Sequence, residues 1–325
     1  MKNYFLAISL LFYSISIIAQ PVWKEYGPML VPKKSGSVFS NGIGRVTFIR
    51  LHPDYDGIYN KTFFVGAFGG LWKTPDEGET WENCNTDNLL MLAVSDLAID
   101  PVNPNIMYLA TGDFDRVFKR HLKYYNEEHS QSIGIYKSTD GGNTWGDEPY
   151  GVWNGDESFW STPSLKKISR ILIDPDDNNK LYCALIQYVP YVKNGEKLFS
   201  NDGYIYKSDN YGLTWNSIFY ANNGYFRSME FAPNDPDVIY VSGQKTFIVK
   251  HSGTIVIDAG TAGLPDSTVR NVIAVTPGQD SWVWALTNEI EDNSSNIFNL
   301  YKSTDYGNSF QIVGDDLYFS GNEKP

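Results

Sequence analysis

Two short motifs alternate along this chain, and their repetition constrains the fold more than any other feature. The first is a turn with the frame Ser/Thr-x-Asp-x-Gly-x-Thr-Trp, usually preceded by an aromatic residue and a lysine. Its four copies are Thr74–Trp81, Ser138–Trp145, Ser208–Trp215 and Ser303–Phe310. The second motif is an apolar strand, an Asp-Pro-like turn and another apolar strand, with turn prolines at Pro53, Pro101, Pro175, Pro233 and Pro277. Repeats separated by tens of residues indicate a repeat architecture.

The segments beside these turns have the pattern of β-strands. They are short, rich in Ile, Val, Tyr and Phe, and bounded by Pro, Asn, Asp and Gly. Each unit therefore predicts an inner strand, a proline turn, a second strand, a loop, a third strand, the repeated turn and a fourth strand. Such units are the blades of a β-propeller. We expect an all-β β-propeller of four-stranded blades, with about five blades visible.

The residue types in the repeated turn favour a structural role. An Asp in a tight turn accepts hydrogen bonds from the backbone N–H groups that follow it, and Gly142 tolerates a positive φ. Trp145 can bury its ring between sheets. Calcium is a weaker alternative because each copy offers one carboxylate and one copy has Asn instead, so we expect neither a metal nor a cofactor. The residues given this structural role are Asp76, Gly78, Trp81, Asp140, Gly142, Trp145, Asn210, Gly212, Trp215, Asp305, Gly307 and Phe310.

This turn resembles the Asp-box (BNR) repeat of sialidases, of xyloglucan-degrading glycosidases and of the sortilin/VPS10 propeller. The layout from Trp23 and Tyr26-Gly27-Pro28 to Gly44-Arg45-Val46 is similar to exported Asp-box propellers of sortilin type in Bacteroidota. The resemblance covers nearly all of the chain after residue 19. It implies the propeller fold, but one fold hosts many activities.

The N-terminal residues are typical of an export signal. One lysine precedes an apolar run from Tyr4 to Ile18, and Ala19 supplies a small residue for cleavage. We therefore expect residues 1–19 to be a signal peptide, residues 20–325 to be the propeller, and the protein to be extracellular or in the cell envelope. A membrane anchor is less favoured because the apolar run is short for a span.

The C-terminal residues 315–325 resemble the beginning of another unit. The sequence leaves two alternatives open: a longer propeller of which this is a part, or a ring closed by a strand from Trp23–Val38.

Net charge bears on the class of ligand, and the cysteines bear on whether the protein contains a disulfide. The formal net charge of −12 argues against a nucleic-acid ligand, which selects basic surfaces. Cys84 and Cys183 are the only cysteines. Export would permit a disulfide, but their positions favour two free thiols, with Cys183 buried in a strand.

Ligand binding is expected on one rim of the propeller. The proline turns and the repeated turns should share a rim, because the chain returns to the opposite rim between them. That opposite rim receives the long, variable connections Gly112–Ser132, Gly146–Lys167, Gln187–Gly203 and Asn288–Asn296. Variable loops on a rigid scaffold are where function concentrates.

Charged residues recur near the beginning of the inner strands, on the same rim. They are Arg45, Asp96, Arg170, Arg227 and Arg270. Converging guanidinium groups would bind carboxylate or phosphate. The sialidase resemblance implies the same, because a cluster of three arginines holds the substrate carboxylate there. The alternative is that these arginines pair with neighbouring carboxylates and brace the ring.

The variable connections also carry acids and aromatic rings that suit a carbohydrate or a protein partner. The candidates are Asp113, Asp115, Arg116, Trp153, Asp156, Glu157 and Trp160. A glycosidase needs two carboxyl groups, and Asp113 with Asp156 or Glu157 is the candidate catalytic pair. Alternatively, Trp153 and Trp160 only fasten a long loop to its blade.

Two departures from the families favour binding without catalysis. Xyloglucan-degrading relatives carry an Asp just before the Gly-Gly of the first unit, but the matching stretch Val65–Gly70 contains no acid. Sialidases carry Arg-Ile-Pro where this chain has Arg45-Val46-Thr47. We therefore expect an exported module that binds a glycan, a peptide or an envelope protein. The alternative is a sialidase-like or xyloglucanase-like glycoside hydrolase, and an assembly factor is a third, less favoured function.

Overall fold

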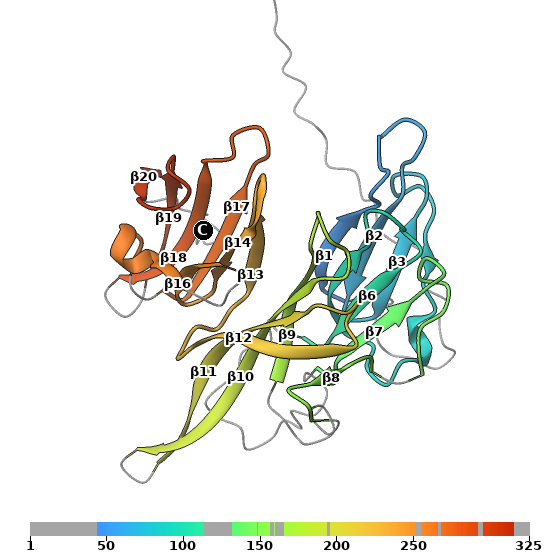
Figure 1. Ribbon diagram of the computed structural model, residues 1–325, viewed down its shortest axis with the longest axis horizontal. Coiled ribbons are helices and arrows are strands. Elements are labelled where there is room, and N and C mark those ends of the chain that lie inside the picture. Colours follow the sequence, from blue (N-terminus) through green and yellow to red (C-terminus); the bar gives the residue numbers. More distant parts are fainter. Residues whose placement is uncertain are drawn as a thin grey trace, which may run out of the picture.

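A computed structural model describes residues 44–113, 132–147, 149–156, 159, 166–193, 196–250, 255–265, 268–291 and 295–314. These residues form five sheets placed side by side (Figure 1). The first contains β1 (Val46–Leu51), β2 (Phe63–Ala67), β3 (Gly70–Thr74) and β4 (Glu82–Asn83). The second contains β5 (Val94–Ile99), β6 (Met107–Thr111) and β7 (Ile135–Ser138). The third contains β8 (Val152–Trp153), β9 (Lys166–Ile173), β10 (Leu181–Lys193), β11 (Glu196–Ser208) and β12 (Thr214–Ala221).

The last two sheets keep the simple order of four strands. The fourth sheet contains β13 (Ser228–Ala232), β14 (Asp235–Ser242), β15 (Thr246–Lys250) and β16 (Ile255–Asp258). The fifth contains β17 (Arg270–Val275), β18 (Val283–Glu291), β19 (Ser295–Ser303) and β20 (Gln311–Gly314). Two short 3₁₀ helices, η1 (Thr86–Asn88) and η3 (Ala259–Ala262), lie in connections.

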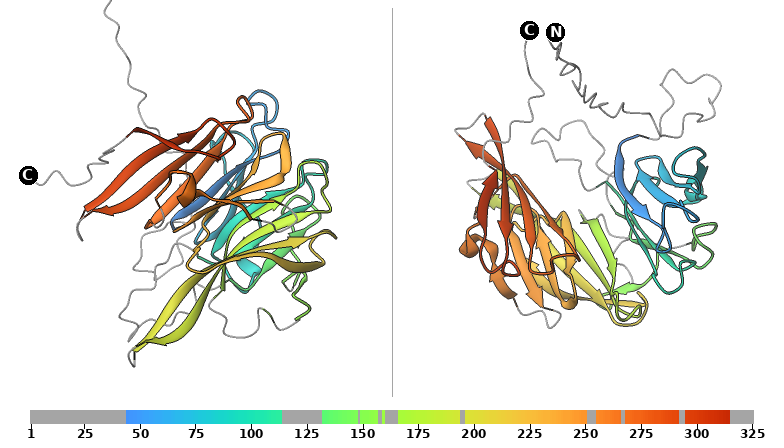
Figure 2. Two further views of the ribbon diagram at one scale, coloured as in Figure 1. Left: turned by 60° about the vertical axis from the view of Figure 1, so that its left-hand side comes forward. Right: turned by 90° about the horizontal axis from the view of Figure 1, so that it is seen from above.

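The sheets are the blades of a β-propeller, as the sequence predicted. The inner strands β1, β5, β9, β13 and β17 contact one another in chain order. Seen from above, the sheets follow an arc that is open between the first and the fifth (Figure 2). Buried apolar side chains fill the space between consecutive sheets.

One strand changes sheet, which the sequence did not predict. The second sheet has three strands in the described residues, and β8, which follows its repeated turn, pairs in parallel with β12 of the third sheet. The cause is aromatic packing: the Trp153 ring stacks on that of Trp215 with centroids 4.6 Å apart and planes inclined by 6°. Phe159 stacks on the other side of Trp153 at 5.5 Å. Burial of these rings holds β8 on the neighbouring sheet.

Two of the connections predicted as loops are instead extended hairpins. β10 and β11 stay paired from Leu181–Ser208 to Lys193–Glu196, which makes the long arm in Figure 1. β18 and β19 likewise pair from Val283–Ser303 to Glu291–Ser295. The prediction of long loops at these positions was wrong, because β-branched and aromatic residues continue the strands beyond the sheet. Most of residues 112–132 and several residues of 146–167 lie outside the described part of the chain.

The four repeated turns share one hydrogen-bond pattern. In the second copy, Asp140 Oδ1 accepts from Ser138 Oγ and Thr144 N, both at 2.8 Å, and Oδ2 accepts from Thr144 Oγ1 at 2.6 Å. Gly142 N donates to Ser138 Oγ at 3.0 Å. Asn210 preserves this pattern in the third copy, because its Nδ2 donates to the Thr214 hydroxyl. Glycine follows a left-handed residue in each copy, with φ of 84° at Gly142.

The two kinds of turn lie on the same rim, as predicted. Each repeated turn donates a backbone hydrogen bond to the proline turn of its own sheet. The four pairs are Glu77 N to Lys61 O, Gly141 N to Asn105 O, Tyr211 N to Asn179 O and Tyr306 N to Ser281 O. The beginnings of the inner strands are therefore on the opposite rim.

Both cysteines are free thiols, as expected, and Cys84 is buried as well as Cys183. Burial raises the pKa of Cys84 to about 12, which makes this thiol unreactive at neutral pH. Trp145 Nε1 donates to the Cys84 carbonyl at 2.8 Å and so ties the second repeated turn to the first sheet. No helix of the described residues is long and apolar enough to cross a membrane.

Candidate functional site

A rim group of Arg45, Phe68 and Asp113 lies where the first two sheets meet. Arg45 precedes β1, Asp113 follows β6, and the guanidinium group forms an ion pair with the carboxylate. Phe68, between β2 and β3, donates its backbone N–H to Arg45 O at 3.1 Å and leaves its ring exposed. Gly44 is needed beside it, because φ is +82° and a Cβ there would lie 2.9 Å from Phe68 Cβ. This group combines an aromatic surface with hydrogen-bonding side chains.

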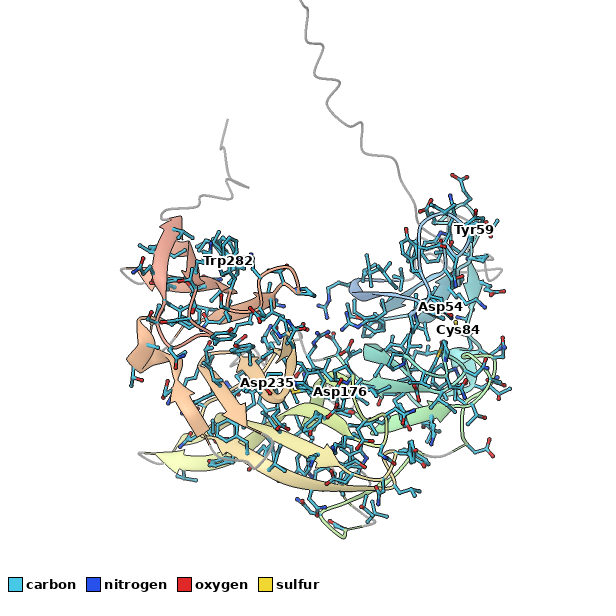
Figure 3. The ribbon with its side chains drawn as sticks, turned by 45° about the horizontal axis from the view of Figure 1, so that its top comes forward. Asp54, Tyr59, Cys84, Asp176, Asp235 and Trp282 are labelled. Atoms are coloured by element: carbon cyan, nitrogen blue, oxygen red, sulfur yellow. The ribbon has the colours of Figure 1, made fainter. Side chains whose placement is uncertain are left out.

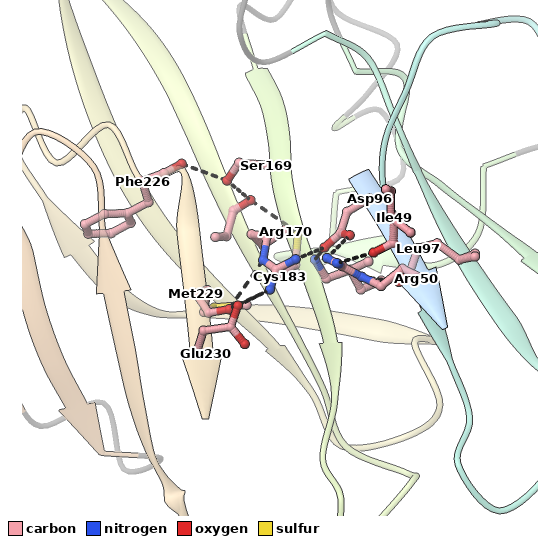
Figure 4. Close-up of polar contacts among 12 residues, drawn as sticks. Ile49, Arg50, Asp96, Leu97, Ser169, Arg170, Cys183, Phe226, Met229 and Glu230 are labelled. Carbon is pink, nitrogen blue, oxygen red and sulfur yellow. Dashed lines mark hydrogen bonds and ion pairs between the residues drawn. The ribbon is translucent and has the colours of Figure 1, made fainter. Parts of the chain in front are cut away.

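An ion-pair chain crosses four inner strands below the rim (Figure 4). Its members are Arg50 on β1, Asp96 on β5, Arg170 on β9 and Glu230 on β13. Asp96 is fully buried and pairs with both arginines, with Arg170 Nη1 at 3.3 Å from its Oδ2. The same oxygen accepts from Ile171 N at 3.0 Å. Arg170 Nη2 also donates to Met229 O at 3.3 Å and pairs with Glu230.

The chain contains two positive and two negative groups, so it is balanced. Burial raises the pKa of Asp96, and Arg50 opposes the rise. Burial also raises the pKa of Glu230 to about 7, again opposed by Arg50. The inner strands therefore pair both arginines with carboxyl groups of the protein, and one of these groups, Glu230, exchanges its proton near neutral pH.

The predicted arginines make contacts of different kinds in the described residues. Arg45 belongs to the rim group and Arg170 to the ion-pair chain. Arg227 donates to Tyr225 OH at 2.8 Å and lies 4.4 Å from the centroid of that ring. Arg270 begins β17, opposite Asn288. The alternative interpretation, pairing with neighbouring carboxylates, describes Arg45 and Arg170.

Asp96 and Trp153, both predicted to contact a ligand, are buried inside the protein. Asp96 bridges two arginines, and Trp153 fastens β8 between Phe159 and Trp215, as the alternative prediction held. Asp156 lies exposed after β8. Burial lowers the pKa of Lys166 in the third sheet, and the nearby Asp156 opposes the fall, whereas Asp113 pairs with Arg45 of the first sheet. The pairing of these two carboxyl groups stays a prediction. Asp115, Arg116, Glu157 and Trp160 lie outside the described residues.

Sequence reasoning missed Arg50 and Glu230, although a signal was present. Each lies three residues before its turn proline, whereas Asp96 and Arg170 lie five residues before theirs. Positions two apart on a strand point to the same face, so all four side chains share the face of their sheet that meets the next one. In the described residues no group of three or more His, Cys, Asp and Glu could hold a metal ion.

Comparison with known proteins points to glycoside hydrolases. No family model matches the chain. It is 26% identical over 238 residues to a xyloglucanase of Acetivibrio thermocellus, a match that covers 69% of this chain and 24% of the relative. A xyloglucanase of a Paenibacillus species is 25% identical over 240 residues, covering 70% and 19%. The chain thus spans about a quarter or less of the curated relatives it matches.

A solved structure supports the fold alone. An ancestral GH74 enzyme superposes with a TM-score of 0.56 at 17% identity, over 84% of this chain and 32% of that chain.

Proposed function

We propose that this chain belongs to an exported glycoside hydrolase propeller that acts on a neutral polysaccharide of the xyloglucan class. The observation that carries this proposal is its similarity to two xyloglucanases over 69% and 70% of its length. We also assign the repeated turn to the Asp-box type, since all four copies share one hydrogen-bond frame. Residues 1–19 are the proposed export signal.

The charges at the rim favour a neutral ligand over an acidic one. A receptor for sialic acid or another anionic glycan needs guanidinium groups free to meet carboxylate. Here Arg45 is paired with Asp113, and Arg170 is paired with Asp96 and Glu230. An anion would have to displace these carboxylates, whereas a neutral sugar needs only stacking and hydrogen bonds.

The rim group is the proposed place of contact. The exposed Phe68 ring can stack on the apolar face of a sugar, and the half-exposed Arg45 guanidinium can donate hydrogen bonds to its hydroxyl groups. Asp113, which pairs with Arg45 at this rim, is also the proposed carboxyl group in the reaction.

Glycan binding without hydrolysis is the second candidate, and Ala67 favours it. The resemblance to xyloglucan-degrading enzymes implies an Asp just before the Gly-Gly of the first unit, where this chain has Ala67 and Phe68.

Incubation of the purified chain with xyloglucan separates the two candidates. We expect new reducing ends, at a rate that Asp113→Asn lowers by about 100-fold or more. Phe68→Ala should weaken retention in a xyloglucan affinity gel by about 5- to 10-fold through lost stacking. Asp156→Asn is the matched control and should leave both readouts unchanged. Retention without reducing ends would establish the second candidate, and neither readout above background would refute both.

A further inference from the structure

The first sheet exposes an apolar face. In every later sheet the equivalent face is buried against the preceding sheet. Ile49 and Leu51 on β1 are each 57% exposed. Leu97, which occupies the position of Ile49 in the second sheet, is 1% exposed because it packs against the first sheet. The difference comes from the neighbour and not from the residue type.

The fifth sheet exposes its other face, which in the earlier sheets packs against the sheet that follows. Val272 on β17 is 39% exposed and lies opposite Leu286 of β18. The next row on this face is Ala274, Trp284 and Lys302. In the fourth sheet the equivalent row is Glu230, Tyr240 and Ile248, of which Tyr240 and Ile248 pack against the fifth sheet. Figure 3 shows Trp282 of the fifth sheet and Tyr59 of the first at opposite ends of the arc.

Contacts inside the chain show what covers such a face. Tyr108 OH of the second sheet donates to Tyr211 O, in the repeated turn of the third, at 3.0 Å. Tyr240 OH of the fourth sheet donates to Tyr306 O, in the repeated turn of the fifth, at 3.1 Å. The same interface thus joins the aromatic row of one sheet to the repeated turn of the next.

The two open faces are complementary halves of this interface. The fifth sheet supplies the aromatic row, with Lys302 Nζ at 3.0 Å from the Trp282 centroid and 4.9 Å from that of Trp284. The first sheet supplies the repeated turn, with Glu77 at the position of Tyr211 and Tyr306. Lys137 of the second sheet lies 6.0 Å from the Tyr211 ring, so a lysine facing this turn position already occurs within the chain. Glu77 pairs with Lys61 in its own sheet, with Lys61 Nζ 3.0 Å from its Oε2, and Lys302 would be a second cation beside this carboxylate.

We propose that these faces join two copies of this chain head to tail, the fifth sheet of one copy packing on the first sheet of the next. Such an interface is heterologous, because two different surfaces meet. Each contact would bury Ile49, Leu51 and Val272 in the way that the internal interfaces bury their equivalents.

Sedimentation velocity on the full chain, from about 1 to about 100 µM, tests this proposal. We expect a concentration-dependent rise in the sedimentation coefficient. The double variant Ile49→Lys/Leu51→Lys blocks the first face and Val272→Lys blocks the fifth, so each should remain monomeric over that range. Burying an unpaired lysine should weaken association by at least about 10-fold. Val102→Lys is the control on a proline turn, where Val102 is 77% exposed, and should associate like the unmodified chain.

A mixing experiment identifies the interface. An equimolar mixture of the two blocked variants should form a 1:1 complex, because one retains the fifth face and the other the first. A monomeric unmodified chain at every concentration would overturn the proposal and would point instead to residues 20–43 or 315–325 of the same chain as the cover. Association of the blocked variants that equals that of the unmodified chain would also overturn it, and circular dichroism checks that all variants are folded.

Discussion

A single carboxylate closes three of the four repeated turns, and the Asn210 amide takes its place in the third copy. Asp140 accepts hydrogen bonds from the hydroxyl of Ser138 and from both the backbone and the hydroxyl of Thr144. The Thr144 hydroxyl bond is the main cause that lowers the pKa of Asp140, and Thr80 and Ser309 lower those of Asp76 and Asp305 in the same way. The ionised acid is therefore part of the folded turn. Its contribution to stability is present above the unfolded pKa of about 3.9 and is lost as the pH falls through the lowered folded pKa.

Two replacements of Asp140 distinguish the effect of its hydrogen-bond geometry on stability from the effect of its charge. We expect Asp140→Ala to lower the free energy of unfolding by about 1 kcal/mol at pH 7, because three hydrogen bonds lose their acceptor in a solvated turn. Asp140→Asn should lose less, since Asn210 makes the equivalent bonds in the third copy. Urea unfolding measures both variants. Equal losses for the two would show that the charge, and not the acceptor geometry, closes the turn.

At the scale of elements, contacts between strands of different sheets fix where each strand goes. β8 leaves the second sheet for the third because Trp153 stacks between Phe159 and Trp215. The inner strands are joined by the chain from Arg50 to Glu230, which crosses the boundaries between four consecutive sheets. Removal of one member should therefore affect more than one sheet.

Trp153→Ala should destabilise the protein by about 3–5 kcal/mol, because it leaves a cavity between β8 and β12. Tyr59→Ala, which removes an exposed ring, is the control and should change the free energy of unfolding by about 0.5 kcal/mol or less. Denaturant titration measures both. A loss for Trp153→Ala as small as the control's would mean that β8 is held by its backbone pairing alone.

Glu230 should make stability depend on pH near neutrality. Its folded pKa of about 7 is above the value of an unfolded glutamate, so its contribution is greatest below the unfolded pKa of about 4.3 and falls as the pH rises through 7. The unmodified chain should therefore lose stability relative to Glu230→Gln between pH 5 and pH 8, by on the order of 1 kcal/mol after solvent screening. Glu82→Gln removes an exposed acid and serves as the control. Parallel pH profiles for the unmodified chain and Glu230→Gln would contradict the assignment.

At the scale of the whole molecule, the net charge and the exposed faces of the first and fifth sheets determine which partners the propeller can bind. The formal net charge of −12 repels polyanions, and Arg45 and Arg170 face carboxylates of the protein itself. A neutral polysaccharide is not repelled by the negative charge and does not need to displace a carboxylate from an arginine. The first and fifth sheets, at the ends of the arc, add an apolar route to association that is independent of charge.

Salt should therefore have little effect on glycan binding. We expect retention by xyloglucan to change by less than about 2-fold between 50 and 500 mM NaCl, because screening acts on charges and not on stacking. Polygalacturonate should bind at least about 10-fold more weakly than xyloglucan at low salt. Affinity gel electrophoresis measures both. Tighter binding of the acidic polymer, released by salt, would show that the arginines leave their carboxylates to hold a ligand.

The sequence by itself determined the features that depend on neighbours within a few residues. The four repeated turns, the proline turns, the strands between them and the rim that the turns share all follow from local hydrogen bonding and alternation. The burial of Cys183 also followed, because this residue lies inside an apolar strand.

Only the tertiary structure decided which side chains meet across sheets. The partners of Arg45 and Arg170, the transfer of β8 and the burial of Asp96 all depend on how consecutive sheets are placed. The physical reason is that a turn is closed by bonds within one short segment, whereas an ion pair such as Asp96–Arg170 forms between residues far apart in the sequence, whose distance depends on the packing of every side chain between the sheets.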